Sequence, residues 1–270
     1  MSVTPSTPHR LALAAAVNAA RQAGAALRRG FADPAKEAET KAHRHDPVTI
    51  YDRQADRIIA DILLAATPDA GLLSEEGTRS DGAGHFRWVV DPLDGTNNFL
   101  RGVPDFAVSI ALTDPDGPCV ACIYDPLRDE LYTAIRGAGA ERNGESIRVS
   151  GQTTLDGAVL GVGFSTESAR RLITLAQLPT FAPSVRSLRI VGSAALDLAY
   201  VAAGRFDATW YLSLHDWDVA AGRLLVSEAG GQVTDLSGSP LICPQDDGIL
   251  ASNGALHGPL LASLRASAHP

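Results

Sequence analysis

Short apolar strands alternate with helical segments along most of this 270-residue chain, and such alternation predicts packed layers of sheet and helix. In the first half, we expect strands at residues 71–74, 87–90, 107–112, 119–124 and 130–134, with a tight turn at Asn143-Gly144. In the second half, we expect strands at 158–162, 187–191, 207–211 and 231–235, separated by helices at 167–178, 194–203 and 219–229. The fold class predicted is therefore α/β or α+β.

Two helices are expected before the first of these strands. The alanine-rich stretch after Arg10 begins like a secretory signal, but its helical periodicity continues to Gly30, so we interpret it as an ordinary helix closed by glycine. A second helix, at about residues 52–66, carries an apolar stripe at helical spacing. No stretch approaches the roughly 20 apolar residues that a membrane span requires, so no membrane partner is expected.

Composition limits the partners and the compartment. A net charge of -8 argues against binding nucleic acid or an anionic membrane through a general basic field. Three cysteines are too few for a disulfide framework, which favours a reducing, cytoplasmic location. Cys119 and Cys122 form a CxxC within a predicted strand, where residues three apart face opposite sides, so we expect core filling rather than redox or zinc chemistry. We expect one unit, 1–270, with halves 1–148 and 149–270 and no flexible linker.

The segment from Trp88 to Phe99 is the most informative for chemistry. An apolar strand leads into Asp91, a proline turn and Asp94, and then into Gly95 and Thr96, which suit the start of a helix. The two carboxylates can converge beside outward-pointing backbone N–H groups, which is a cation site next to a phosphate site. The alternative is that Asp94 caps a helix and Asp91 bonds a turn.

Three further segments place acids at the end of a strand or the beginning of a helix. Glu75 and Glu76 follow a strand, and alternation allows only one of them to serve the same site; we choose Glu75, partly because a family resemblance favours it. Asp216 and Asp218 open an apolar helix, where one of them is expected to be a cap. The third segment, residues 46–52, leads into the second predicted helix.

Thr49 and Asp52 have the spacing of a capping box, which competes with a catalytic role for Asp52. His215 is expected to be structural.

Carboxylates gathered in one cleft repel one another unless a cation holds them, and an all-oxygen donor set favours Mg²⁺ or Mn²⁺ over Zn²⁺. The sequence therefore predicts a divalent-cation site at the ends of the strands.

The combination resembles the inositol monophosphatase family of magnesium-dependent, lithium-sensitive phosphatases. Residues 91–99, Asp-Pro-Leu-Asp-Gly-Thr-Asn-Asn-Phe, match the family's first signature, and residues 217–222, Trp-Asp-Val-Ala-Ala-Gly, match its second. The resemblance extends from Lys41 to Gly231. It implies a layered αβαβα sandwich, commonly a homodimer, and hydrolysis of a small soluble phosphomonoester by in-line attack of a metal-activated water.

The resemblance also implies roles for individual residues. Two or three Mg²⁺ ions, or Mn²⁺ as a substitute, would be bound by Glu75, Asp91, Asp94, Asp218 and the backbone carbonyl of Leu93. Catalysis is assigned to Asp52, Thr96 and Glu75. Phosphate and substrate binding are assigned to Asp94, Gly95, Thr96, Lys41, Ser193, Ala194 and Tyr211.

One substrate-reading position differs from the family pattern. Inositol-specific members have a glutamate six residues before the signature tryptophan, and here that residue is Tyr211. We therefore expect an inositol-1-phosphate-like substrate, with histidinol phosphate, 3′-phosphoadenosine 5′-phosphate and fructose 1,6-bisphosphate as alternatives. A non-catalytic regulator that binds metal and phosphate is the alternative from another class.

Overall fold

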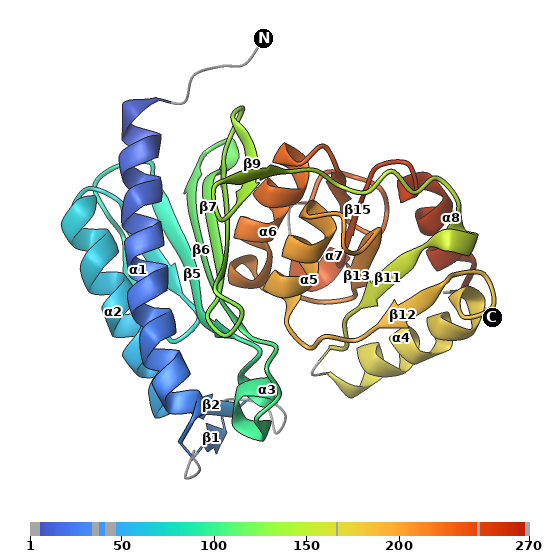
Figure 1. The fold of residues 1–270 in the computed structure, drawn as a ribbon, viewed down its shortest axis with the longest axis horizontal. Helices are drawn as coiled ribbons and strands as arrows, with labels where there is room; N and C mark the ends of the chain where they lie inside the picture. Colours follow the sequence, from blue (N-terminus) through green and yellow to red (C-terminus); the bar gives the residue numbers. More distant parts are fainter. Residues whose placement is uncertain (1–5, 34–37, 41–46, 166, 242–243, 268–270) are drawn as a thin grey trace.

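Helices and sheets form alternating layers in the computed structural model, which describes residues 6–33, 38–40, 47–165, 167–241 and 244–267 (Figure 1). Helices α1 (Thr7–Phe31) and α2 (Ile50–Ala66) cover one face of the first large sheet. Helices α5 (Ala194–Ala202) and α6 (Asp216–Glu228) lie between the first sheet and the second. Helices α4 (Ser168–Phe181) and α8 (His257–Ser267) cover the outer face of the second sheet. The predicted layered α/β sandwich is confirmed.

The first large sheet has the strand order β10-β9-β8-β7-β6-β5-β3-β4. Within it β3 and β5 run parallel and the other neighbours are antiparallel. The strands are β3 (Gly71–Ser74), β4 (Arg79–Ser80), β5 (Arg87–Asp94), β6 (Ala107–Asp114), β7 (Gly117–Asp125), β8 (Glu130–Ile135), β9 (Gly139–Arg142) and β10 (Glu145–Ile147). A separate small sheet pairs β1 (Ala38–Thr40) with β2 (Pro47–Thr49), and the short helix α3 spans Thr96–Arg101.

The second large sheet has the strand order β12-β11-β13-β15-β14. Its strands are β11 (Val159–Val162), β12 (Ser187–Arg189), β13 (Ala208–Tyr211), β14 (Gln232–Thr234) and β15 (Ile249–Ser252). Strands β11, β12 and β13 are parallel to one another, so their carboxyl ends meet at one edge of the sheet. A 3₁₀ turn, Leu155–Gly157, and the short helix α7, Pro244–Asp247, complete the elements.

Three apolar cores fill the spaces between the layers. The core under α1 and α2 includes Leu27, Ile59 and Trp88, and the core around α5 and α6 includes Leu198 and Leu225. The third core joins the second sheet to α4 and α8. Within the described residues no helix combines the length and apolarity that crossing a membrane requires.

Helix α1 packs closely because small residues line its buried face. Its amino end is capped by Ser6, whose side chain accepts a hydrogen bond from the His9 backbone N–H. Gly24 faces the ring of Tyr124, and an added Cβ would lie 2.6 Å from that ring. Gly30 was expected to close the helix, but it lies inside it against the ring of Tyr51, and the helix continues to Phe31. Gly30 therefore allows the Tyr51 ring to approach the helix closely and does not end the helix.

Several strands and helices of the structure were not predicted from the sequence, and one predicted strand was too short. Strand β5 was expected to end at Val90, but it continues through Asp94 with a register shift between Asp91 and Asp94. The turn at Asn143-Gly144 is confirmed, since both residues have positive φ, and it joins the unpredicted pair β9 and β10. Strand β15 and helix α8 were not predicted either.

The two described cysteines fill the core as expected, but not on opposite faces. A β-bulge in the pairing of β6 with β7 leaves Cys119 without a register partner, and Cys119 and Cys122 both join the core beneath α1. Burial raises the pKa of Cys119 to about 11 and that of Cys122 to about 12, so both stay thiols at neutral pH.

Candidate active site

The four predicted acidic ligands line one cavity of about 240 Å³ between the two large sheets. Glu75 follows β3, Asp91 and Asp94 lie on β5, and Asp218 lies in the first turn of α6. Carboxylate oxygens of Asp91, Asp94 and Asp218 lie within 4.8 Å of one another. Residues from three separated segments are therefore brought to one point.

The parallel pairing of β3 and β5 brings the first of these acids together. Ser74 pairs with Val90, and the backbone N–H of Glu75 donates to the Val90 carbonyl at 3.1 Å. The backbone N–H of Leu93 then bonds to Asp91 Oδ1 at 2.9 Å, which holds that side chain in the turn. Glu75, rather than Glu76, lines the cavity, as the sequence predicted.

Asp94 is held by the beginning of α5. Its Oδ2 accepts hydrogen bonds from the Ser193 hydroxyl and from the Ala195 backbone N–H, the latter at 2.7 Å. Ser193 also caps α5 by accepting from the Leu196 N–H. Ser193 was predicted to bind substrate, but it is buried and does not line the cavity, whereas Ala194 does. Its contacts are those of a residue that positions Asp94.

Burial and mutual repulsion raise the pKa values of these acids. Burial, followed by the charges of Glu75, Asp94 and Asp218, raises the pKa of Asp91 well above its usual range. Burial raises the pKa of Asp94 to about 6, against the opposing effect of the bonds from Ser193 and Ala195. Crowded carboxylates that resist ionisation become stable anions when a divalent cation shares them, so the donor set fits a hard cation such as Mg²⁺.

Asp52 serves both of the roles that the sequence left in competition. Its Oδ2 accepts from the backbone N–H of Thr49 at 2.8 Å and from the Thr49 hydroxyl, which closes the capping box of α2. Its Oδ1 lies 3.1 Å from Thr96 Oγ1, which is also 3.0 Å from the Leu93 carbonyl oxygen. One oxygen of the buried Asp52 carboxylate therefore closes the helix cap, and the other bonds Thr96, which lines the cavity.

Gly95 places the start of α3 beside the acids. Its φ of 98° lies in the left-handed region, and an added Cβ would lie 2.9 Å from the Asp105 carbonyl oxygen. Glycine is therefore required at this turn. Gly95 and Thr96 line the cavity together with Asp94, and both were predicted to bind phosphate.

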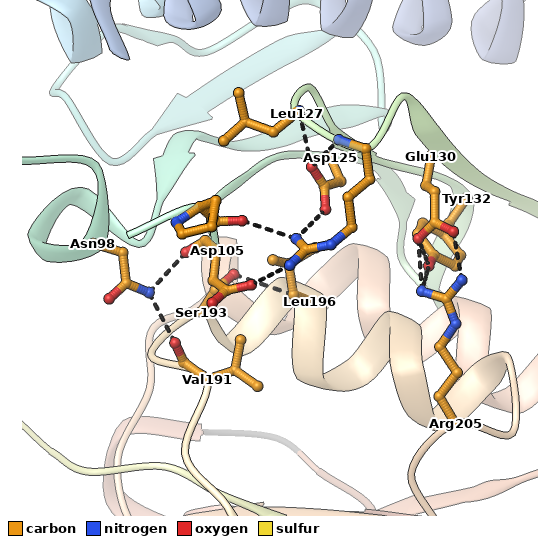
Figure 2. A network of polar contacts seen from close by, with 12 residues as sticks. Asn98, Asp105, Asp125, Leu127, Glu130, Tyr132, Val191, Ser193, Leu196 and Arg205 are labelled. Atoms are coloured by element: carbon orange, nitrogen blue, oxygen red, sulfur yellow. Dashed lines mark hydrogen bonds and ion pairs between the residues drawn. The ribbon is translucent and has the colours of Figure 1, made fainter. Parts of the chain in front are cut away.

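Asn98 links the loop that follows α3 to the segment that precedes α5. Its side-chain amide donates to the Asp105 carbonyl at 2.7 Å and to the Val191 carbonyl at 2.8 Å, and Figure 2 shows it between these two residues. Asp105 is fixed in turn by Arg128, which also bonds the fully buried Asp125. This network holds the segment before α5, including Ile190 and Gly192 of the cavity wall, against the loop that follows α3.

The second sheet supplies a wall of different character. Strands β11, β12 and β13 end at the cavity and contribute Val162, Gly163, Phe164, Ile190 and Tyr211, and Leu214 follows. The Tyr211 hydroxyl donates to Asp197 Oδ2 at 2.7 Å. Asp197 is fully buried, and burial raises its pKa to about 7. Its Oδ1 has no hydrogen-bond partner among the described residues.

Some expectations lie outside this cluster, and some residues were missed. Lys41 lies outside the described residues. Asp216 is exposed and does not line the cavity, so Asp218 is the member of that pair that belongs to the site, and the exposed His215 stacks on Trp217. Asp197 was missed, although an aspartate inside an otherwise apolar helix is a signal of a buried polar role.

Comparison with known proteins agrees with this geometry. The model of the inositol monophosphatase family matches residues 10–269. A protein of Xylella fastidiosa named Nus factor SuhB is 46% identical over 83% of this chain and 81% of its own length. An inositol-1-monophosphatase of Rhizobium meliloti is 44% identical over 82% of this chain and 84% of its own. The crystal structure of extragenic suppressor protein suhB from Bartonella henselae superposes with a TM-score of 0.89 at 40% identity, covering 93% of this chain and 97% of that one.

These matches define a family whose fold is the one described above. The chain belongs to the inositol monophosphatase family.

Proposed function

We propose that this protein is a magnesium-dependent phosphatase that hydrolyses a small soluble phosphomonoester. The observation that carries the proposal is the convergence of Asp91, Asp94 and Asp218 in a cavity that Thr96, bonded to Asp52, also lines. Family membership supports a phosphatase, and the geometry supports its metal dependence.

Glu75, Asp91, Asp94, Asp218 and the carbonyl oxygen of Leu93 would hold two or three Mg²⁺ ions, with Mn²⁺ as a substitute. Bound there, divalent cations supply charge neutralisation for the phosphoryl oxygens and the leaving oxygen. This contribution is large for phosphomonoesters, whose uncatalysed hydrolysis is among the slowest of biological reactions.

The chain's own residues position the attacking water and take its proton. A water beside Thr96 Oγ1 attacks phosphorus in line, forming the new P–O bond as the ester P–O bond breaks. Its proton passes to Thr96 Oγ1 while the Thr96 hydroxyl proton passes to Asp52 Oδ1, 3.1 Å away, and the departing alkoxide takes a proton from solvent water to leave as the alcohol. The two bonds from Thr49 keep Asp52 oriented for this transfer. The backbone at Gly95 and Thr96 would cradle the phosphate, with Glu75 and Lys41 as the remaining predicted participants.

Candidate substrates follow from the relatives and from the alternatives already named. The Rhizobium meliloti relative is named for inositol 1-phosphate chemistry, which makes inositol 1-phosphate the first ester to test. Histidinol phosphate, 3′-phosphoadenosine 5′-phosphate and fructose 1,6-bisphosphate come next, because Tyr211 replaces the inositol-reading glutamate. We also propose a cytoplasmic homodimer, which light scattering would test.

A regulatory function is the second candidate, and the names of relatives favour it. The Xylella fastidiosa and Escherichia coli relatives, at 46% and 39% identity, are both named Nus factor SuhB. A regulator of that kind could retain the fold with or without turnover.

A phosphate-release assay separates the two candidates. The purified chain is incubated with each ester in Mg²⁺, in chelator, and in Mg²⁺ with Li⁺. We expect release only with Mg²⁺ and inhibition by Li⁺. No release from any ester would reject the phosphatase and favour the regulator.

A further inference from the structure

The wall from the second sheet contrasts chemically with the acids opposite. Among the described residues that line the cavity, all four acidic side chains come from outside the second sheet and its strand ends. The strand ends themselves contribute aliphatic and aromatic groups, together with the backbone of Gly163 and Gly192. The part of a substrate that lies on this side would therefore contact apolar side chains and no charged ones.

Tyr211 is fixed in this wall from two directions. Its hydroxyl is engaged by the buried Asp197, and its ring lies so close to Gly163 that a Cβ there would fall 1.7 Å from a ring carbon. Only 5% of Tyr211 is exposed. The residue therefore presents a rigid aromatic surface, and its one polar atom is already bonded within the protein.

Ile190 extends the same wall and is 57% exposed, which is high for a large apolar residue beside a cavity. Phe164 lies at the end of β11 on the same side. A polyol placed here would lose water from its hydroxyls and gain no partner from these side chains, which costs binding free energy. A flat ring would cover the apolar surface and make close contacts.

We propose that the ester cleaved in this site has a leaving group with a flat, weakly polar ring, aromatic or heteroaromatic, seated against Tyr211, Phe164 and Ile190. This inference rests on the proposed phosphatase function and names its substrate class. Tyr211 acts in it as a specificity-determining residue, and Asp197 and Gly163 act as the residues that position it.

Three esters of matched chemistry test the substrate class. Benzyl phosphate carries a flat ring on a primary alkoxide, cyclohexylmethyl phosphate carries a ring of similar size that is not flat, and inositol 1-phosphate carries a polyol. We expect kcat/KM with Mg²⁺ to be highest for benzyl phosphate, by about tenfold over inositol 1-phosphate. A higher kcat/KM for inositol 1-phosphate than for benzyl phosphate would overturn the proposal.

Variants locate the effect in the wall. Ile190→Ser should lower kcat/KM for benzyl phosphate about fivefold more than it lowers kcat/KM for glycerol 2-phosphate, chiefly through KM, since only the benzyl ring covers this residue. Leu172→Ser is the matched control, because Leu172 is 67% exposed on α4 and outside the cavity lining. Tyr211→Ala should abolish the preference for benzyl phosphate, with circular dichroism to confirm folding. Equal losses for both esters in Ile190→Ser would contradict the proposed seat.

A binding measurement keeps the inference separate from the proposed function. Calorimetry in Mg²⁺ should show benzylphosphonate, which has no ester bond to hydrolyse, binding about tenfold tighter than methylphosphonate. That result would support the ring seat even if no ester released phosphate, an outcome that rejects only the phosphatase. Equal affinity for the two phosphonates, with turnover of inositol 1-phosphate, would reject the ring seat and retain the phosphatase.

Discussion

The cavity has two walls built mainly by different sheets, and one wall is acidic whereas the other is apolar. The first sheet and the start of α6 supply Asp91, Asp94 and Asp218, whereas the second sheet supplies Tyr211 and its apolar neighbours. Acids on the first side face one another, and a bound cation would relieve their mutual repulsion. The difference suggests that reaction type is set by one sheet and substrate choice by the other.

Two buried aspartates make the contrast sharper. Asp91 and Asp197 both have pKa values raised by burial, but the neighbours of Asp91 are carboxylates, whereas those of Asp197 are the hydroxyls of Thr209 and Tyr211. Burial alone therefore does not identify a metal ligand. The identity of the facing groups does.

The largest effect is expected from breaking the acidic wall. Asp91→Asn should lower kcat by about a thousandfold, because it removes charge stabilisation made at the reacting phosphoryl group. Stability without metal should be unchanged or higher, since an amide does not repel the neighbouring acids. The control Asp216→Asn makes the same charge change at an exposed position outside the cavity. Wild-type turnover of Asp91→Asn at saturating Mg²⁺ would refute the ligand assignment.

A smaller loss is expected from the proton-accepting pair. Asp52→Asn should lower kcat by about a hundredfold with little change in KM, because Thr96 then lacks a base behind it. Thr96→Val should have a similar effect, and the double variant should be no worse than either single one if they act as a unit. Steady-state phosphate release measures all three. Additive losses would show that the two residues act independently.

Removing the Asn98 side chain, which links the loop after α3 to the segment before α5, should have a moderate effect on stability and on KM. Asn98→Ala removes two hydrogen bonds, to Asp105 and Val191, at a cost of about 2 kcal/mol of unfolding free energy. KM for the preferred ester should rise a fewfold, because Ile190 and Gly192 are no longer held. Urea denaturation and steady-state kinetics measure the two effects. Asn18→Ala, at an exposed position on α1, is the control.

The smallest effect is a pH dependence of thermal stability. Folding raises the pKa of Asp94 from 3.8 to about 6, so its contribution to stability is complete below pH 3.8 and is lost as the pH rises through about 6. Metal-free protein should therefore lose about 5 °C more in Tm over this range than its Asp94→Asn variant, in which residue 94 does not titrate. Saturating Mg²⁺ should restore Tm more at pH 7.5 than at pH 4.5. Scanning calorimetry that shows equal Mg²⁺ effects at both pH values would contradict this.

Much of the fold was predictable because apolar periodicity and turn residues encode it locally. Strand β3 and the α1–α2 pair follow from such patterns, and so does the turn at Asn143-Gly144. Strand β15 and helix α8 were not predicted, because closely spaced Gly and Pro residues after residue 235 interrupt the apolar periodicity. The bulge at Cys119 was unpredictable from alternation, since it depends on the pairing of β6 with β7.

The site was predictable to the extent that its acids sit at the ends of elements. The spacing of Asp91 and Asp94, and the choice of Glu75, agree with the cavity that the structure shows. The shared use of Asp52 depends on which oxygen faces which neighbour, and sequence does not encode that. The Tyr211–Asp197 bond joins residues 14 apart through tertiary packing, which no local pattern reveals.

Helix α6 carries Asp218 at its amino end while its body packs against β5, β6 and β7 of the first sheet. The acidic cluster is therefore incomplete until the chain has been synthesised well beyond its midpoint. A nascent chain would hold Asp91 and Asp94 in an unfinished pocket. Capture of the proposed cation would therefore be a late event of biogenesis, and a ribosome-bound intermediate stalled before α6 would have only part of the acidic cluster.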